Sequence, residues 1–140
     1  MKRYLVVAHD TATSAALLDT LRDRAAAGPC SFHLVIPVKH PPGVWTEGQV
    51  MAAARARLDD VLAQYTAMGL EVTGGVGDVS PVRAANDALF EGHYDEVILS
   101  TLPPGPSRWI HQDVPSRLAR LCPVPLTHVV ASPAAAVPSN

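Results

Sequence analysis

The side chains best suited to chemistry cluster between residues 100 and 113. An apolar run ends at Ser100 and Thr101, a proline-rich loop follows, and a short helical pattern begins near Asp113. A buried strand, a loop and a helix are what α/β proteins use to hold an anion at a helix N-terminus. Here prolines at positions 103, 104 and 106 stand where a phosphate-binding loop has glycines, and an acid stands in place of a neutral donor.

The same loop carries a cation, an aromatic ring and an imidazole. Arg108 can hold a phosphate with two parallel hydrogen bonds, and Trp109 can stack on a base. The alternative, which the sequence favours, is a lid that Trp109 fixes to the core while Arg108 and His111 stay in solvent. Gly105 and Ser107 are the loop residues suited to close contact with a phosphate.

Three further residues each leave two interpretations open. Asp10 follows the first apolar run and is either a ligand contact or a turn acid that caps the next helix. Asp113 is either a ligand-binding acid or, as the sequence favours, a helix N-cap stabilised by free N–H groups. Trp45 either flanks a ligand pocket or anchors its own loop.

No catalytic or metal site is expected. The six histidines show no i, i+4 pair and no cysteine at zinc spacing. Ser100 and Thr101 lack the context of an activated nucleophile, and Cys122, before a proline, is expected to be an inert buried thiol.

Composition excludes several classes of protein. The chain has 140 residues, which suits one domain, and a net charge of −2. Neither a basic stripe for nucleic acid nor a run long enough to span a membrane is present. Two cysteines without a disulfide framework favour a reducing, cytoplasmic location.

Apolar runs alternate with helical patterns along the chain. Strands are expected at residues 4–8, 32–38, 70–76, 96–101 and 126–131. Helices are expected after a cap at Thr11 or Thr13, after Thr46, after the Ser80-Pro81 pair and after Asp113. Inward-facing helix residues are expected to be Leu18, Leu21, Ala25, Met51, Ala54, Leu58, Val61, Tyr65, Met68, Val82, Ala85 and Leu89. The alternation predicts a three-layer α/β sandwich of five parallel strands and four helices over residues 1–131, with a flexible tail at 132–140.

Four pieces of sequence together resemble the universal stress protein family, a branch of the Rossmann-like adenine nucleotide α-hydrolase group. They are residues 5–10, a strand that ends in Asp10; residues 33–38; Gly77-Asp78 with the helix after it; and residues 95–100 with the Cys-Pro-Val segment at 122–124. The resemblance covers residues 3–131. It implies strand order 3-2-1-4-5 and a crevice between the first and fourth strands, where that order reverses.

The resemblance also identifies candidate binding residues. The crevice would be formed by Asp10, Ser100, Thr101 and the 102–112 loop, with Val38 at its side. Nucleotide-binding members carry G-x-x-G-x9-G-[S/T], but those positions fall here on Ser100, Pro103, Asp113 and Val114. A gap of one residue moves the last pair to Gln112 and Asp113, which fits no better.

The resemblance therefore implies a cytoplasmic, non-enzymatic stress or regulatory protein, and the loop after residue 101 favours one that binds ATP weakly or not at all. Prolines offer no N–H to a phosphate, and an ionised Asp113 would repel a triphosphate. The alternative is an adenine-nucleotide switch that binds ATP or AMP through a divergent loop with Arg108. A hydrolase has the least support. A homodimer through the last strand is expected, because that edge carries no charge to block pairing.

Overall fold

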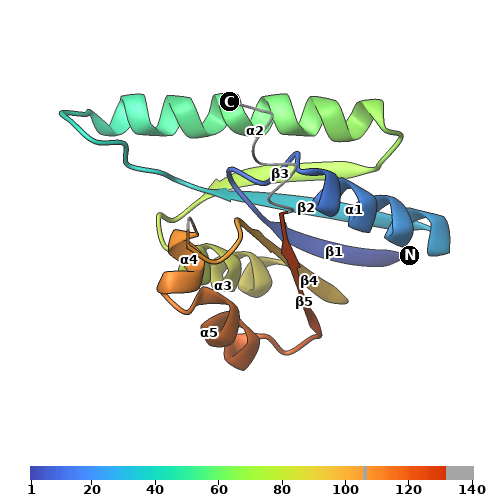
Figure 1. The fold of residues 1–140 in the computed structure, drawn as a ribbon. Helices are drawn as coiled ribbons and strands as arrows, with labels where there is room; N and C mark the ends of the chain where they lie inside the picture. Colours follow the sequence, from blue (N-terminus) through green and yellow to red (C-terminus); the bar gives the residue numbers. More distant parts are fainter. Residues whose placement is uncertain (106, 132–140) are drawn as a thin grey trace.

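The structure is a computed structural model that describes residues 1–105 and 107–131 (Figure 1). The predicted tail at 132–140 and Pro106 lie outside the described residues. Ten elements follow one another along the chain: β1 (Lys2–Val7), α1 (Ala15–Ala27), β2 (Cys30–Pro37), α2 (Glu47–Ala67), β3 (Val72–Gly77), α3 (Pro81–Glu91), β4 (Glu96–Thr101), α4 (Arg108–His111), α5 (Val114–Leu121) and β5 (Leu126–Val130).

The five strands form one parallel sheet in the order β3-β2-β1-β4-β5, which confirms the predicted topology. β1 lies at the centre: Tyr4 is in register with Phe32 of β2 on one side and with Glu96 of β4 on the other. The chain therefore winds in both directions from β1. The carboxyl ends of β1 and β4 meet at the point where the strand order reverses.

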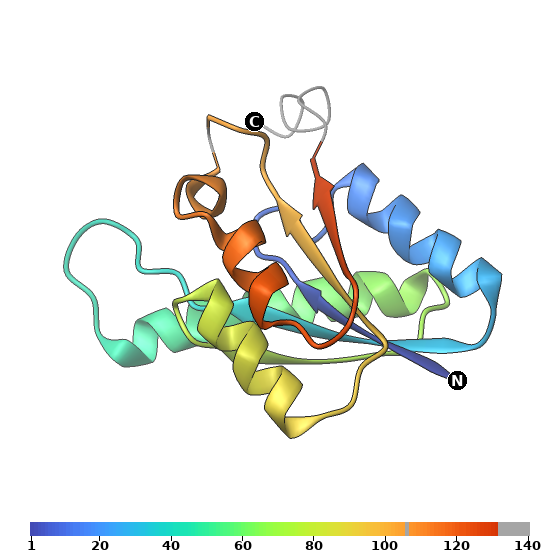
Figure 2. The ribbon, with the colours of Figure 1, turned by 90° about the horizontal axis from the view of Figure 1, so that it is seen from below.

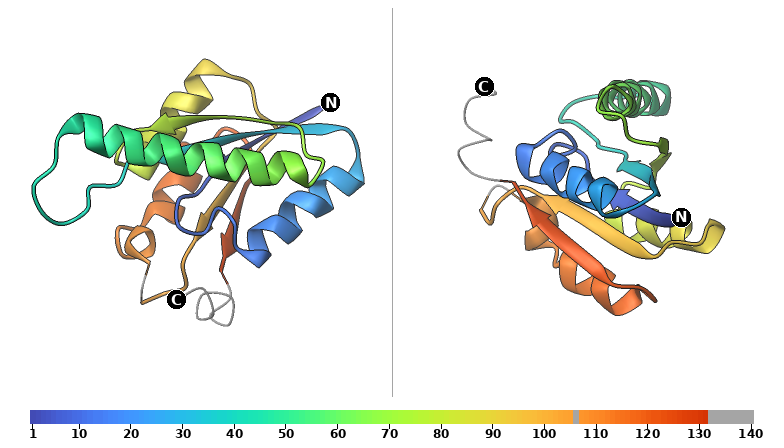
Figure 3. Two further views of the ribbon diagram at one scale, coloured as in Figure 1. Left: turned by 90° about the horizontal axis from the view of Figure 1, so that it is seen from above. Right: turned by 90° about the vertical axis from the view of Figure 1, so that its right-hand side faces the viewer.

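Helices cover both faces of the sheet, as the alternating pattern predicts. α1 and α2 lie on one face (Figure 3, left), and α3, α4 and α5 lie on the other (Figure 2). Alternate residues of β1 enter the two cores: Val6 packs with Leu58 and Tyr65 on the α2 side, while Val7 packs with Ala85 on the α3 side. Because both faces are buried, β1 is continuously apolar.

Two helix starts were predicted correctly, and one was placed wrongly. Thr46 caps α2 and forms a reciprocal capping box with Gln49, and Ser80 caps α3 with proline at the first helical position. The cap of α1 is Ser14, whose hydroxyl accepts from Leu17 N, and not Thr11 or Thr13. The Thr11 hydroxyl is instead bonded to Ser100 across the strand ends.

The inward face of α2 differs from the prediction at its first residue. The buried residues are Val50, Ala54, Leu58, Val61 and Tyr65, whereas Met51 is 45% exposed. Val50 and Met51 both fit the spacing of one apolar stripe, since they precede Ala54 by four and three residues. On α1, Leu17 replaces Ala25, which is exposed; Leu18, Met68 and Leu89 are partly buried.

The segment after β4 contains a short helix, α4, where a loop was expected, so the described residues hold five helices rather than four. Asp113 occupies the N-cap position of α5, but its side chain makes no capping hydrogen bond. Its φ of 58° is the single positive value among the described non-glycine residues. The predicted side-chain cap is therefore wrong, because the turn that joins α4 to α5 uses Asp113 in a left-handed conformation.

Among the described residues, none of the helices has the length and apolar character needed to span a membrane.

Candidate functional site

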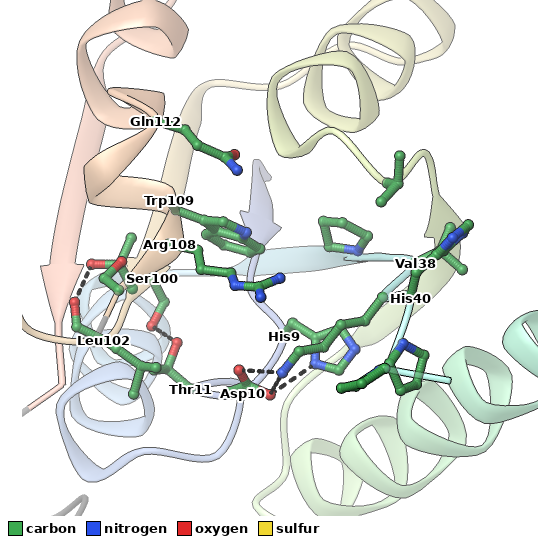
Figure 4. A pocket seen from close by; sticks show the side chains of 17 residues that line it. His9, Asp10, Thr11, Val38, His40, Ser100, Leu102, Arg108, Trp109 and Gln112 are labelled. Carbon is green, nitrogen blue, oxygen red and sulfur yellow. Dashed lines mark hydrogen bonds and ion pairs between the residues drawn. The ribbon is translucent and has the colours of Figure 1, made fainter. Parts of the chain in front are cut away.

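A pocket of about 710 Å³ lies at the carboxyl ends of β1, β2 and β4 (Figure 4). Its walls come from the β1–α1 turn, the loop after β2, and the segment from β4 into α4. This volume is in the range of small-ligand pockets. The pocket stands at the switch point of the sheet, where doubly wound folds bind their ligands.

Most of the residues predicted for the site line this pocket. Asp10, Val38, Ser100, Thr101, Ser107 and Arg108 all lie on its surface. Gly105 and His111 are not among its lining residues. The His111 ring donates from Nε2 to Gly105 O at 2.9 Å, so these two residues form a hydrogen bond within the segment after β4.

Asp10 is held by a cation and an imidazole. Lys39 Nζ lies 2.8 and 3.0 Å from its two carboxylate oxygens, and His9 Nδ1 lies 3.3 Å from Oδ1. That nitrogen is buried and makes no well-aligned hydrogen bond within the described residues. His9 first, and then Lys39, hold the pKa of Asp10 well below its ordinary value, against the opposing effect of burial.

The structure excludes one of the two interpretations of Asp10, namely that it caps the helix after β1. It does not cap α1, because Ser14 does. Its carboxylate faces the pocket with 46% of the side chain exposed. Its charge is already paired, so a ligand that uses Asp10 competes with Lys39 or binds the pair together.

Lys39 is the main residue that the sequence analysis missed. It comes two residues after β2, at the end of the sheet that carries Asp10. The signal was available, because parallel strands bring the residues after their carboxyl ends to one edge. His9, Thr11 and His40 also line the pocket and were not predicted as site residues, whereas Gln112, which also lines it, is the last residue of the 102–112 loop predicted to form the crevice.

A further cation, on α2, donates hydrogen bonds to the backbone of the β1–α1 turn. Arg57 of α2 donates Nη2 to His9 O at 3.1 Å and to Asp10 O at 3.4 Å, and Nε to His9 O at 3.3 Å. These hydrogen bonds engage two main-chain carbonyl oxygens that lie beyond the end of β1. The turn that carries Asp10 is therefore tied to a long helix.

The hydroxyls at the end of β4 are engaged with partners other than a catalytic base. Ser100 Oγ lies 2.6 Å from Thr11 Oγ1, and both residues are buried. The Thr101 hydroxyl donates to Leu102 O at 2.9 Å, and it lies 2.8 Å from His128 Nε2. A hydroxyl has one proton, so His128 Nε2 is the donor to Thr101.

The loop residues Ser107, Arg108 and Trp109 all line the pocket, but they differ in burial. Ser107 is buried and caps α4, accepting from Ile110 N at 3.1 Å. Trp109 is partly buried and packs against the core on the α3 side, as the lid interpretation predicts. Arg108 is exposed, which fits that interpretation, and it also extends from α4 into the pocket (Figure 4).

Asp113 and Trp45 contribute nothing to the pocket lining. Asp113 is exposed, and its neighbour Gln112 lines the pocket instead. Trp45 is 40% exposed and lies beyond the lining residues. Cys122 is a free thiol whose pKa is raised by burial. The described residues contain no group of three His, Cys, Asp or Glu side chains that could hold a metal ion.

Comparison with known proteins identifies the fold. No protein-family model matches the chain, and no curated protein is a significant match. A structure of a universal stress protein family member from Burkholderia pseudomallei matches with a TM-score of 0.60 at 20% identity, covering 91% of this chain and 94% of that one. This chain has the universal stress protein fold.

Two other solved structures agree with that assignment. The universal stress protein from Archaeoglobus fulgidus has a TM-score of 0.65 at 14% identity, covering 92% of this chain and 93% of that one. A universal stress protein family protein from Arabidopsis thaliana, with AMP bound, has a TM-score of 0.64 at 9% identity, covering 96% and 94%. At these identities the likeness shows the fold alone.

Proposed function

We propose that this chain is a universal-stress-protein-like regulatory protein of the cytoplasm, without enzymatic activity, that binds ATP weakly or not at all. Residues 1–131 form its functional domain, and it assembles as a homodimer through β5. Support for the dimer comes from the strand order, which leaves β5 at an edge, and from Val130, which is 39% exposed. Two free cysteines fit a reducing compartment.

The backbone at the end of β4 carries the proposal on ATP. A phosphate cradle needs glycines whose N–H groups approach the ligand closely. Here the first glycine position is Ser100, buried and bonded to Thr11, and the second is Pro103, which has no N–H. A triphosphate would therefore lose the backbone donors that bind it in a glycine-rich loop.

Asp113 does not supply the repulsion of a triphosphate that the sequence predicts, because it is outside the pocket lining. Asp10 takes its place as the acid that faces the pocket, but Lys39 neutralises much of its effect. The weak binding of ATP therefore rests on missing donors rather than on an unpaired negative charge.

A second candidate function is a switch that binds a nucleotide with fewer phosphates, such as AMP. The observation in its favour is that two cations, Lys39 and Arg108, approach one pocket from separate elements. Two cations can bind one phosphate group without a glycine cradle. The structure from Arabidopsis thaliana has AMP bound, which makes AMP the natural first ligand to test.

Isothermal titration with Mg-ATP and with AMP tests both candidates. The proposal expects no saturable heat with ATP at micromolar protein, and a dissociation constant for ATP in the low micromolar range or tighter would overturn it. If AMP binds, each charge-assisted contact is worth about 1.5–3 kcal/mol. Arg108→Ala should then weaken AMP binding by roughly tenfold or more without abolishing it, because Lys39 remains.

A matched control keeps that result interpretable. Arg117→Ala removes an arginine of α5 that is exposed and absent from the pocket lining. It should leave AMP binding unchanged. Turnover of ATP by the purified protein would instead support a hydrolase and contradict the non-enzymatic proposal.

A further inference from the structure

A second hollow lies between β3 and α3, on the face of the sheet that α3 covers. It has a volume of about 770 Å³. Its floor is formed by β2 and β3, at Val35, Gly75 and Gly77, and one wall is formed by α3, at Ala84, Ala88 and Glu91. We call this hollow the β3 groove. The pocket with Asp10 and Arg108 lies at the strand ends and is distinct from it, although Val38, His40 and Val79 border both.

The strand that borders this groove has a free edge within the described residues. β3 ends the sheet order, so it pairs with β2 alone. Phe32 N donates to Glu71 O and Val38 N donates to Gly77 O, at 2.9 and 3.1 Å. Residues 71, 73, 75 and 77 therefore turn their backbone groups toward β2, and by alternation Val72, Gly74 and Val76 present theirs outward. These outward groups can pair with another extended chain.

Glycines leave the groove side of β3 flat. A Cβ added at Gly75 would meet no heavy atom within 4 Å. On the opposite face, a Cβ at Gly74 would lie 2.7 Å from Leu58 Cδ1 and 3.2 Å from Leu62 Cδ1 of α2. α2 thus covers one face of β3, while the space above Gly75 on the other face is open. A long side chain on an added strand could cross that space toward α3.

The charge around the groove is mainly negative. Glu47, Asp78, Asp87 and Glu91 all line it, and among the described residues none of the four forms an ion pair. One arginine opposes them: Arg3, whose guanidinium lies over the Tyr94 ring at 5.0 Å from its centroid. Burial, and then Arg3, lower the pKa of His33, so that ring is mainly neutral at pH 7.

Exposed apolar side chains continue the groove beyond the end of β3. Met51 is 45% exposed and Val79 is 53% exposed, and both line the hollow. An apolar side chain of an occupant would be desolvated there. The groove therefore combines outward backbone groups of an edge strand, four carboxylates and an apolar end.

We infer that the β3 groove binds an extended, lysine- or arginine-rich segment of another protein, which adds to β3 as a sixth strand. Backbone hydrogen bonds to Val72, Gly74 and Val76 supply the general affinity of strand addition, and alternate side chains supply specificity. Basic side chains cross Gly75 and reach Asp87 and Glu91 on α3. This inference is independent of nucleotide binding in the other pocket.

The test uses the full chain and a fluorescein-labelled peptide of alternating lysine and valine, with fluorescence anisotropy as readout. Two control peptides isolate the causes: one replaces lysine with glutamate, and one places proline at the centre, which removes a backbone donor. We expect saturable binding of the basic peptide, weaker binding of the proline peptide and none of the acidic peptide. Equal binding of the basic and proline peptides would overturn strand addition.

Variants of the protein locate the site. Asp87→Asn/Glu91→Gln should weaken binding of the basic peptide by roughly tenfold, whereas Asp59→Asn/Asp60→Asn, an exposed acidic pair on α2 outside the groove lining, should not. Gly75→Val fills the open floor and should also weaken binding. Thermal melts by circular dichroism establish that each variant is folded.

Amide hydrogen exchange completes the test. Bound peptide should slow exchange at Val72, Gly74 and Val76 more than at other amides of the sheet. Slowed exchange confined to the pocket at Asp10, or equal weakening by the two acidic double variants, would overturn the inference. Self-association that persists in the Val130→Lys variant, detected by light scattering, would also overturn it, because the occupant of β3 would then be a second copy.

Discussion

Two adjacent glycines of β3 should respond in opposite ways to the same substitution. A Cβ at Gly74 would lie 2.7 Å from Leu58 Cδ1 and 2.9 Å from the backbone oxygen of Leu34, whereas a Cβ at Gly75 would meet nothing within 4 Å. A leucine methyl can turn aside, but a backbone oxygen of the neighbouring strand cannot move without disturbing the sheet. The two alanine variants therefore differ in sign.

The magnitudes follow from this geometry. Overpacking costs about 1–3 kcal/mol, which is the loss expected for Gly74→Ala. Gly75→Ala meets no obstacle, and its φ is not in the left-handed range. It should gain about 0.4–1 kcal/mol, because alanine reduces the conformational freedom of the unfolded chain. The two variants should thus differ by about 1.4–4 kcal/mol, which corresponds to roughly 5–14 °C in Tm for a chain of this size.

Urea unfolding followed by far-UV circular dichroism measures this difference, with equal m-values as the condition for comparing midpoints. Gly77→Ala provides a second tight position, since its Cβ would lie 2.7 Å from Ala84 Cβ. It should destabilise the protein as Gly74→Ala does. If Gly75→Ala proved as harmful as the other two, the groove side of β3 would not be open, and the inferred docking of a basic segment would fall with it.

Three further predictions concern charge and assembly. Arg24 donates two hydrogen bonds to Glu96, at 2.9 and 3.1 Å, so Arg24→Met should cost about 2 kcal/mol, less than for a fully buried pair; urea unfolding checks this. Burial raises the pKa of Glu96, but its hydrogen bonds outweigh burial and lower that pKa from 4.5. The stability lost in Arg24→Met should therefore be full at pH 7 and shrink as the pH falls below 4.5. A loss of stability that did not change with pH would contradict this. Lys39→Met should raise the pKa of Asp10 in a carboxyl NMR titration, yet change stability at pH 7 by less than about 1 kcal/mol because the pair is half exposed; an unmoved pKa would show that Lys39 does not hold Asp10. Val130→Lys should convert the proposed dimer to a monomer in light scattering, and a wild-type protein that is already monomeric at high concentration would refute the β5 interface.

Local signals in the sequence were sufficient for most of the fold. Ser80 followed by proline, and Thr46 with Gln49 three residues later, specify helix starts by hydrogen bonds that neighbouring residues make. Alternating strands and helices specified the parallel sheet. Where two phases of an apolar stripe were nearly equivalent, as for Val50 and Met51, burial depends on which face of α2 turns toward the core, and the local pattern does not contain that rotation.

The site was less predictable, because its contacts join residues distant in the chain. Asp10 pairs with Lys39 and Ser100 pairs with Thr11, across 29 and 89 residues. Spacing along the chain gives the sheet edge at which such residues gather, but not which side chains face one another. Asp113 shows the same limit: an acid before a helix indicates a cap, yet Asp113 adopts a left-handed backbone conformation in the turn after α4, and its side chain makes no capping hydrogen bond.

Thr101 joins the two surfaces that the proposed function uses. It lines the pocket, and its hydroxyl is bonded to His128 on the edge strand β5. A ligand that displaced this hydroxyl would alter the strand through which the dimer is proposed to form. Linkage between two equilibria is reciprocal: a ligand that shifts the dimer constant by some factor is itself bound more tightly, or more weakly, by the dimer by the same factor. A measurement of ligand affinity at two protein concentrations would therefore report on assembly.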